Sequence, residues 1–392
     1  MKRAPRVLFV GNFLVRHWGN GRSGIDMRLA AGAIRNGWQA LTFSERDIAR
    51  FLAPLGFMRG IGAKMMNDRL VKTARNWKPD FVFIAHCDYV TNEALHAIRE
   101  VVPGVKLVHI NCDPVETEHC CDQIRRRMES CDAIFVTTAG DKLKEWTTGR
   151  NVVGFYPNPS DPSYETEDNS LKTEFRYDLF FAGRPADADQ RKALLAGLMP
   201  KIDPKVRLGF FGMGRPLVVG RAYEEAIAES KMGLSINRFE GWKWYASDRL
   251  THLMGNGLLS FQYDGNSMQD FFTKDETVYF HDVGDLAEKI SFYNTHDDAR
   301  RVLAAAGMRK YRRLFEARRV LRYMVVATGT DPCDTVDVIR SGKLWYNIRH
   351  EEVARKQAQQ GVSPDRPDSP QGVLPGCRRA GGWEGQTRMP LT

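Results

Sequence analysis

Short apolar runs alternate with longer amphipathic stretches along most of the chain. In the first half, the apolar runs are "RVLFVGN", "ALTFSE", "DFVFIAH", "VKLVHINC", "AIFVTT" and "VVGFYPN". Stretches such as "IDMRLAAGAIRNGW" and "TNEALHAIREVV" lie between them and have the spacing of amphipathic helices. Near-continuous apolar strands separated by helices are typical of a parallel sheet that is covered on both faces.

The alternation starts again after residues 157–175, a polar segment with several prolines that predicts a linker. The apolar runs of this second half are "YDLFFAG", "VRLGFFG", "MGLSIN", "LLSFQY" and "TVYFH". From about residue 283 the pattern becomes helical. We therefore predict an α/β protein in which two similar parallel-sheet domains are joined by one linker.

The length of 392 residues suits two domains, and the pattern gives their approximate boundaries. We place an N-terminal domain at 1–160, the linker at 161–176, a C-terminal domain at 177–330, a final helix at 331–356 and a tail at 357–392. The tail is rich in Pro, Gly, Gln and Ser and has few residues that could build a core, so we expect it to be disordered.

The composition narrows the range of partners. Hydrophobic residues make up 43% of the chain, enough for sizeable cores, and the formal net charge of +9 lies mostly outside the tail. This excess favours an anionic partner such as nucleotide phosphates or an acidic membrane surface. The sequence has no dense Lys/Arg block and no nucleic-acid-binding motif, so we do not expect a nucleic-acid partner.

The seven cysteines and the N-terminal segment predict a cytoplasmic protein. The cysteines are odd in number and lack paired spacing, which favours reduced thiols. The segment "MKRAPRVLFVGNFLV" is similar to a signal peptide, but Gly11 and Asn12 interrupt its apolar run and Arg16 follows closely. We expect a first buried strand there. No run approaches the roughly 18 apolar residues of a membrane-spanning helix.

A group of His and Cys residues in the first half raises the question of a metal site. Its members are His109, Cys112, His119, Cys120 and Cys121. Their spacing matches no standard zinc pattern, and burial as small hydrophobic side chains explains the cysteines better. We therefore expect no bound metal.

Ligands of open parallel sheets bind beyond the carboxyl ends of the strands, which selects particular loops as candidate sites. In the first half, "GNFLVRHWGNGRSGID" follows the first strand and contains Gly19, Gly21 and Arg22. The spacing of its glycines is neither a dinucleotide fingerprint nor a P-loop. This glycine loop is compatible with close approach to a ligand and with an ordinary turn.

In the second half, arginines recur at the predicted strand ends. The candidates are Gly183 with Arg184, Asn237 with Arg238, and the helix start with Asp248, Arg249 and His252. A guanidinium group pairs well with phosphate oxygens, so a diphosphate is the ligand that such a cluster favours. Each arginine taken alone is also compatible with a solvated surface charge.

The residues from "YDLFFAGRP" through "KMGLSINR", "SDRLTHLMGNGLLSFQ" and "DETVYFHDVGDLAEKISFYNTHDDARRVLAAAGMRKY" resemble the C-terminal domain of group-1 glycosyltransferases. The similarity covers about residues 177–315 and is closest to the branch related to the spore protein CgeB; the first half fits more loosely. It implies the GT-B fold, two facing Rossmann-like domains with parallel sheets. It also implies a C-terminal helix that crosses back to the first domain, a role that "TVDVIRSGKLWYNIRHEEVARK" could fill.

The resemblance also implies a function. Such proteins transfer a sugar, typically a hexose, from a nucleotide-diphosphate sugar on the second domain to an acceptor on the first, here a glycan, a lipid-linked glycan or a protein. The resemblance suggests retention of configuration. It implies no metal, because protein cations and helix dipoles stabilise the leaving diphosphate. No cofactor is implied beyond the nucleotide-sugar, which is a substrate.

The family pattern assigns roles to several residues of this chain. Arg184 matches the basic residue that lies near the diphosphate after the first strand of the domain. Arg249 and Gly257 match the arginine and the glycine of the family's helical segment. His252 stands where the family usually has a glutamate that binds the ribose. This departure keeps open a non-catalytic protein that binds a nucleotide-sugar or a glycan. A nucleotide-sugar epimerase of the same fold is a further alternative.

His86 and Asp113 are the catalytic candidates of the first half. His86 ends "DFVFIAH", where related enzymes often place a residue that faces the sugar, and Asp113 follows the next strand in "HINCDP". A packed, hydrogen-bonded histidine is the alternative for His86.

His252 and Arg249 share one helical face because they are three residues apart. Gly255 and Gly257 then allow a sharp turn into the next strand. We predict that His252 faces the ribose or the diphosphate of the donor, which would make donor binding depend on pH near neutrality. The alternative is a structural histidine followed by an ordinary helix stop.

Residues 51–66, "FLAPLGFMRGIGAKMM", mix large apolar side chains with Arg59 and Lys64. A core-packed helix and loop is one interpretation. The other is a surface that contacts an anionic membrane or a lipid-linked acceptor, which would place the protein peripherally on the inner membrane face.

Overall fold

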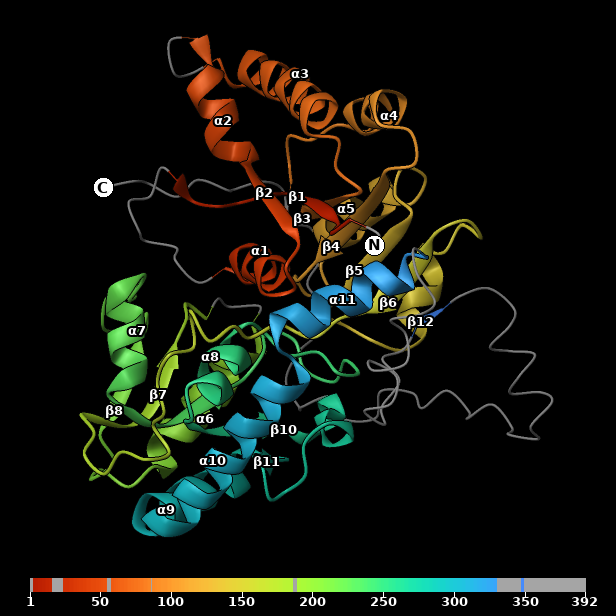
Figure 1. Cartoon of the computed structure of the whole chain (residues 1–392). Helices are drawn as coiled ribbons and strands as arrows, with labels where there is room; N and C mark the ends of the chain where they lie inside the picture. Colours follow the sequence, from red (N-terminus) through yellow and green to blue (C-terminus); the bar gives the residue numbers. More distant parts are fainter. Residues whose placement is uncertain are drawn as a thin grey trace, which may run out of the picture.

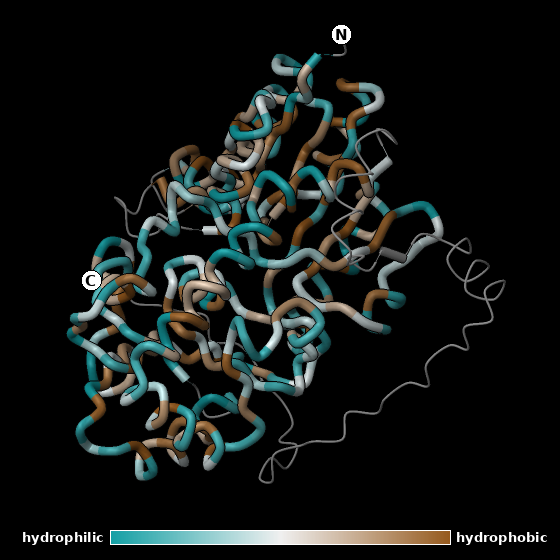
Figure 2. The backbone as a smooth tube through the Cα atoms, turned by 60° about the horizontal axis from the view of Figure 1, so that its bottom comes forward, coloured by the Kyte–Doolittle hydropathy of each residue, from teal (hydrophilic) through white to brown (hydrophobic). Residues whose placement is uncertain are grey.

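The computed structural model describes residues 3–15, 24–54, 58–85, 87–185 and 189–329, together with the backbone of the short strand at 347–348. Two α/β lobes lie one above the other, with the first half of the chain in the upper lobe of Figure 1. Hydrophobic segments occur within both lobes, as Figure 2 shows. The described residues therefore form two domains, each with a sheet and a core of its own.

The N-terminal domain contains a seven-stranded sheet in the order β12-β6-β5-β4-β3-β1-β2. Its strands are β1 (Arg6–Gly11), β2 (Gln39–Ser44), β3 (Phe81–Ala85), β4 (Lys106–Asn111), β5 (Ala133–Val136), β6 (Val152–Phe155) and β12 (Asn347–Ile348). All pairings are parallel except that of β12 with β6. The six apolar runs of the first half are all strands, so this part of the prediction is confirmed.

Helices cover both faces of this sheet. They are α1 (Ile25–Arg35), α2 (Glu45–Leu52), α3 (Arg59–Trp77), α4 (Asn92–Val101) and α5 (Glu118–Arg127). Buried residues of α3 and α4 pack on one face, whereas α1 packs on the other. The sheet is thus enclosed, as near-continuous apolar strands require.

The C-terminal domain contains a five-stranded parallel sheet in the order β11-β10-β9-β7-β8. Its strands are β7 (Tyr177–Ala182), β8 (Leu208–Phe211), β9 (Ser230–Ser235), β10 (Leu259–Tyr263) and β11 (Val278–Phe280). Its helices are α6 (Gln190–Leu198), α7 (Arg221–Ala228), α8 (Arg249–Gly255), α9 (Val283–Thr295) and α10 (Asp297–Leu314). The five predicted strands of the second half are confirmed.

Helix α11 (Ala317–Ala327) returns from the C-terminal domain to the N-terminal one. Its residues Val320, Leu321 and Met324 belong to the core beneath the N-terminal sheet. Its start fits closely against α1, because a Cβ at Gly32 would lie 2.6 Å from the backbone of Ala317. Figure 1 shows α1 and α11 at the junction of the two lobes.

The sequence placed the returning helix at 331–356, whereas the described returning helix is α11, within the segment assigned to the C-terminal domain. Of residues 331–356 the structure describes only β12, which pairs with β6. The apolar face of α11 gives the same spacing whichever domain it covers, so periodicity alone does not identify its partner. The predicted tail at 357–392 lies outside the described residues.

The segment predicted as a linker, 161–176, crosses between the domains and packs against both. Within it Glu165 and Asn169 are buried, and the side chain of Asn169 donates hydrogen bonds to the carbonyls of Ile227 and Ser230. We call residues 161–176 the connection. Across the described residues, no helix is both long enough and apolar enough to cross a membrane.

Candidate functional site

The C-terminal sheet has a switch point between β7 and β9. From β7 the chain continues to β8 on one side, whereas β9 lies on the other, so the carboxyl ends of β7 and β9 flank a crevice. Gly183 and Arg184 follow β7, and Asn237 and Arg238 lie just after β9. The strand-end rule therefore placed these four residues at one crevice of the sheet.

Arg249, the first residue of α8, joins the two strand ends. Its Nη1 donates to the carbonyl of Ile236 at 2.8 Å and its Nη2 to the carbonyl of Ala182 at 3.0 Å. The guanidinium also lies over the ring of Phe181, 4.7 Å from its centre. Burial lowers the pKa of Arg249 from its ordinary value. This cation lies at the switch point, where the dipoles of two strand-end carbonyls hold it.

Glycine is required where the backbone segments meet at this crevice. A Cβ at Gly183 would approach Nη2 of Arg249 to 3.3 Å. At Gly212, which has a φ of +86°, a Cβ would lie 2.3 Å from the carbonyl oxygen of Gly183. The loops after β7 and β8 therefore pack backbone to backbone beside the arginine.

Asn237 organises the loop that leads from β9 to α8. Its backbone N and Nδ2 donate to the carboxylate of Glu240 at 2.6 and 2.8 Å, and its Oδ1 accepts from the backbone N of Ser247. Asn266 donates a further bond to Glu240, and burial raises the pKa of that carboxyl. The sequence analysis missed Glu240, because only the folded loop brings these groups together.

Further arginines surround the start of α6. Arg191 pairs with Asp189, and Nε of Arg238 lies 3.9 Å from the same carboxylate. Asp189 also caps α6 by accepting from the backbone N of Arg191. Arg184 is exposed. Arg191, which the sequence analysis did not select, therefore joins the cations near the crevice.

His252 lies at the junction of the domains. Its ring nitrogens are within 3.3 Å of Nη2 of Arg28 on α1, and its Nε2 is 3.3 Å from Asp248. Its side chain is 14% exposed and its ring packs edge-on against Tyr223. The structure thus places His252 among charged groups, and a contact with the donor stays a prediction.

Gly257 lies two residues beyond the end of α8 in a left-handed conformation with a φ of +73°. A Cβ there would lie 3.0 Å from the backbone N of Asn169 in the connection. Gly255 is still inside α8, where a Cβ would clash with the side chain of Glu165. Both glycines therefore allow α8 to pack closely on the connection, and Gly257 turns the chain towards β10.

At the carboxyl edge of the N-terminal sheet, Cys112 lies near two carboxylates of its own domain, Asp26 and Asp113, and near Asp248 of the C-terminal domain. Burial raises the pKa of the Cys112 thiol, and the neighbouring charges of Asp113, Asp26 and Asp248 raise it further. The backbone N of Asp113 donates to the side chain of Asn111 at the end of β4. Asp113 thus lies just beyond the end of β4, and a catalytic role for it stays a prediction.

The other N-terminal candidates, His86, Gly19, Gly21 and Arg22, lie outside the described residues. The five cysteines that the structure describes are free thiols. Among all the residues that the structure describes, no group of three or more His, Cys, Asp or Glu side chains is placed to hold a metal ion.

A hollow opens beside the crevice, at the carboxyl ends of β9, β10 and β11. Its walls include apolar side chains from α6 and the strand ends, and its rim includes carboxylates. The lining residues are Gln190, Arg191, Leu194, Ile236, Asn237, Glu240, Tyr263, Phe280, His281, Asp282 and Val283. The crevice and this hollow share Asn237, so the two lie side by side at the carboxyl ends of the strands.

Comparison with known proteins bears on both domains. Residues 191–325 match the family model described as Glycosyl transferase-like. Sucrose-phosphate synthase from Thermosynechococcus elongatus superposes with a TM-score of 0.57 at 11% identity, covering 83% of this chain and 98% of that one. HepE of Anabaena, crystallised with UDP and glucose, superposes with a TM-score of 0.51 at 10% identity, over 82% of this chain and 98% of that one.

The chain has the GT-B fold. A third similar structure, that of the Escherichia coli trehalose-6-phosphate protein bound with UDP-2-fluoro glucose, gives a TM-score of 0.52 at 11% identity and covers 83% of this chain and 100% of that one. Comparison with curated protein sequences gives no match. The two facing parallel-sheet domains and the returning helix α11 are the features that this fold describes, so the predicted fold class is confirmed.

Proposed function

We propose that the protein is a glycosyltransferase that uses a nucleotide-diphosphate sugar, with UDP as the first nucleotide to test. The observation that carries this proposal is the crevice at the switch point, where Arg249 joins the ends of β7 and β9 and Arg184, Arg191 and Arg238 lie close by. The domain match to a Glycosyl transferase-like model and the UDP-containing neighbours of the same fold support it.

The residues of this chain suggest how the donor would be held. Gly183 and the amides at the start of α8 would allow close approach of the backbone, and Arg184, Arg238 and Arg249 would neutralise the diphosphate. Gly257, in contrast, packs on the connection beyond the other end of α8. Fixed cations aimed at a leaving diphosphate stabilise the negative charge that develops during transfer. We propose that transfer proceeds without a metal ion and that Asp113 and His86 lie on the acceptor side.

Binding of UDP tests the donor site directly. Arg184→Ala should weaken UDP binding by about 10- to 150-fold, since it removes one charge-assisted hydrogen bond. Arg249→Lys should weaken it as well, because an ammonium group cannot join two carbonyls and a phosphate in the same way. Isothermal titration with UDP, GDP, ADP and CDP would measure both effects.

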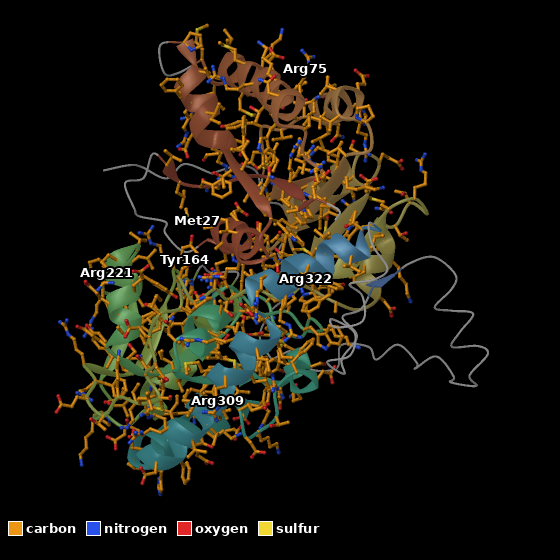
Figure 3. The ribbon with its side chains drawn as sticks, viewed as in Figure 1. Met27, Arg75, Tyr164, Arg221, Arg309 and Arg322 are labelled. Atoms are coloured by element: carbon orange, nitrogen blue, oxygen red, sulfur yellow. The ribbon has the colours of Figure 1, made fainter. Side chains whose placement is uncertain are left out.

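Arg221→Ala provides the matched control, because Arg221 is an exposed arginine of α7 that pairs with Glu225 along its own helix. Figure 3 labels Arg221 on the outer side of the C-terminal lobe. This control should bind UDP like the parent. Equal affinity of the parent, Arg184→Ala and Arg249→Lys would disprove the donor assignment.

A non-catalytic nucleotide-sugar-binding protein is the second candidate function. The observation that favours it is His252, which replaces the family's ribose-binding glutamate and is already engaged by Arg28 and Asp248. Release of UDP from UDP-glucose distinguishes the candidates: turnover indicates a transferase, and saturable binding without turnover indicates the binding protein. An epimerase would instead release the epimerised sugar or nucleotide-sugar, which chromatography of the products detects.

The corner between α2 and α3 suggests where a lipid-linked acceptor would be met. Phe51 is 84% exposed, and Met58, Ile61 and Met65 are 39 to 44% exposed. Arg59 and Lys64 accompany them on α3. We propose that this corner contacts an anionic membrane on its cytoplasmic face, since apolar side chains flanked by cations bind such surfaces.

A further inference from the structure

Arg28 is a fully buried arginine that contacts three parts of the chain. It belongs to α1 of the N-terminal domain, and its Nε and Nη2 donate to Oε1 of Glu165 in the connection at 3.1 and 2.7 Å. Its Nη1 donates to Oδ1 of Asp248, at the start of α8 in the C-terminal domain, at 2.8 Å. One guanidinium group therefore joins both domains and the segment between them.

His252 completes this group, which we call the junction cluster: Arg28, Glu165, Asp248 and His252. The imidazole nitrogens lie 3.2 and 3.3 Å from Nη2 of Arg28, 3.3 Å from Asp248 and 3.7 Å from Glu165. The cluster holds two carboxylates and one permanent cation. Without Arg28, two carboxylates would remain beside a site proposed for an anionic diphosphate.

The charges of the cluster depend on one another. Burial opposes the charge of Arg28, but the carboxylates of Asp248 and Glu165 outweigh it and raise the pKa of Arg28. Burial likewise opposes ionisation of Asp248, but Arg28 and His252 together lower the pKa of Asp248 to about 2. Removal of the guanidinium would leave buried charge uncompensated, which is far less favourable than exposing a surface charge.

The position of the cluster connects it to the donor crevice. Asp248 precedes Arg249, whose guanidinium joins the ends of β7 and β9, and His252 lies one turn further along α8. Met27 on α1 and Tyr164 of the connection, both labelled in Figure 3, mark where these segments meet between the lobes. If the domains separated, Arg28 would leave with α1 while its partner Asp248 stayed with α8.

We propose that Arg28 is a positioning residue that sets helix α8, and with it the donor crevice, against the N-terminal domain. This inference rests on the proposed function, because it concerns the same site. Arg28 reaches the crevice through Asp248 and His252 and has no direct contact with the donor.

Arg35 offers a matched control on the same helix. It donates to Asp161 of the connection at 2.7 and 2.9 Å, so it too pairs with a buried carboxylate. Its side chain is 37% exposed, against 0% for Arg28, and it forms its ion pair with Asp161. Arg35→Met thus removes an arginine between α1 and the connection without touching the junction cluster.

The test compares Arg28→Met, Arg28→Lys and Arg35→Met in the full-length protein. Hydrogen exchange of peptides covering residues 161–170 and 248–255 reports on the cluster, and UDP titration reports on the crevice. For Arg28→Met we expect at least tenfold faster exchange in both segments and at least tenfold weaker UDP binding. Arg35→Met should match the parent over 248–255 and in UDP affinity.

Arg28→Lys keeps the proposal testable if Arg28→Met does not fold. One ammonium group restores the charge but cannot reach both carboxylates with the same geometry. We expect it to restore the melting temperature while exchange over 248–255 stays fast and UDP binding stays weak. Parent-like exchange over 248–255 and parent-like UDP affinity in folded Arg28→Lys would overturn the proposal. If the parent itself binds no nucleotide, the proposed function fails, whereas the exchange measurements still decide whether Arg28 holds α8.

Discussion

Glu45 shows how a single buried carboxyl affects the molecule. It begins α2, is fully buried and accepts a hydrogen bond from the backbone N of Tyr89 at 3.2 Å. Burial raises the pKa of Glu45 from its ordinary value of 4.5 to about 7. The folded state therefore favours the protonated carboxyl, so stability is greatest below pH 4.5 and is lost as the pH rises through about 7.

Glu45→Gln should remove this pH dependence, because the amide carbonyl keeps the bond from Tyr89 and carries no charge. Each pKa unit corresponds to about 1.4 kcal/mol, so we expect the variant to be more stable than the parent by roughly 2 to 3 kcal/mol at pH 8 and nearly equal to it at pH 4. Urea unfolding at both pH values measures the difference. Glu129→Gln, which alters a 67% exposed carboxylate, is the control; a parent-like pH profile for Glu45→Gln would contradict the argument.

At the scale of elements, the apolar runs predicted the strands because buried parallel strands have little freedom in composition. The strand-end rule then placed Gly183, Asn237 and Arg249 at one crevice, since parallel strands share one carboxyl edge. The junction cluster could not be predicted in this way. Its residues Arg28 and Asp248 are 220 positions apart, and no local spacing indicates a contact that only the packed domains create.

The α2–α3 corner gives a prediction about one surface. Phe51→Ser with Ile61→Ser should reduce binding to anionic vesicles, because both side chains are exposed and would enter the lipid interface. Co-sedimentation with phosphatidylserine-containing and neutral vesicles at low and high salt measures the effect. Phe292→Ser changes an exposed phenylalanine of α9 in the other domain and should leave binding unchanged. Failure of the parent to bind anionic vesicles at low salt would exclude the membrane contact.

At the scale of the whole molecule, segments that follow one domain in the sequence complete the core of the other. Helix α11 follows the C-terminal domain in the sequence but completes the N-terminal core. The contact of Ser160 with Glu316 brings the end of the first domain beside the start of α11. A mixed cluster that includes Ala139, Phe155 and Trp244 is buried between the lobes. The sequence indicates two domains and, through the family resemblance, a returning helix, but it places that helix at 331–356 and not at α11, because each helix shows only that it has an apolar face.

Leu321→Ala tests whether α11 couples the domains. Leu321 is fully buried in the N-terminal core, so truncation should cost about 2 to 5 kcal/mol through lost burial and a residual cavity. Because the N-terminal sheet loses this support, its strands should exchange amide hydrogens faster although the mutation lies more than 150 residues further along the chain. Urea unfolding combined with hydrogen exchange of peptides from β1 and β4 measures both effects. Val302→Ala, at a 66% exposed position of α10, should change neither. If Leu321→Ala accelerated exchange only in the C-terminal domain, α11 would belong energetically to the domain that precedes it, and its packing in the N-terminal core would contribute little to the stability of that core.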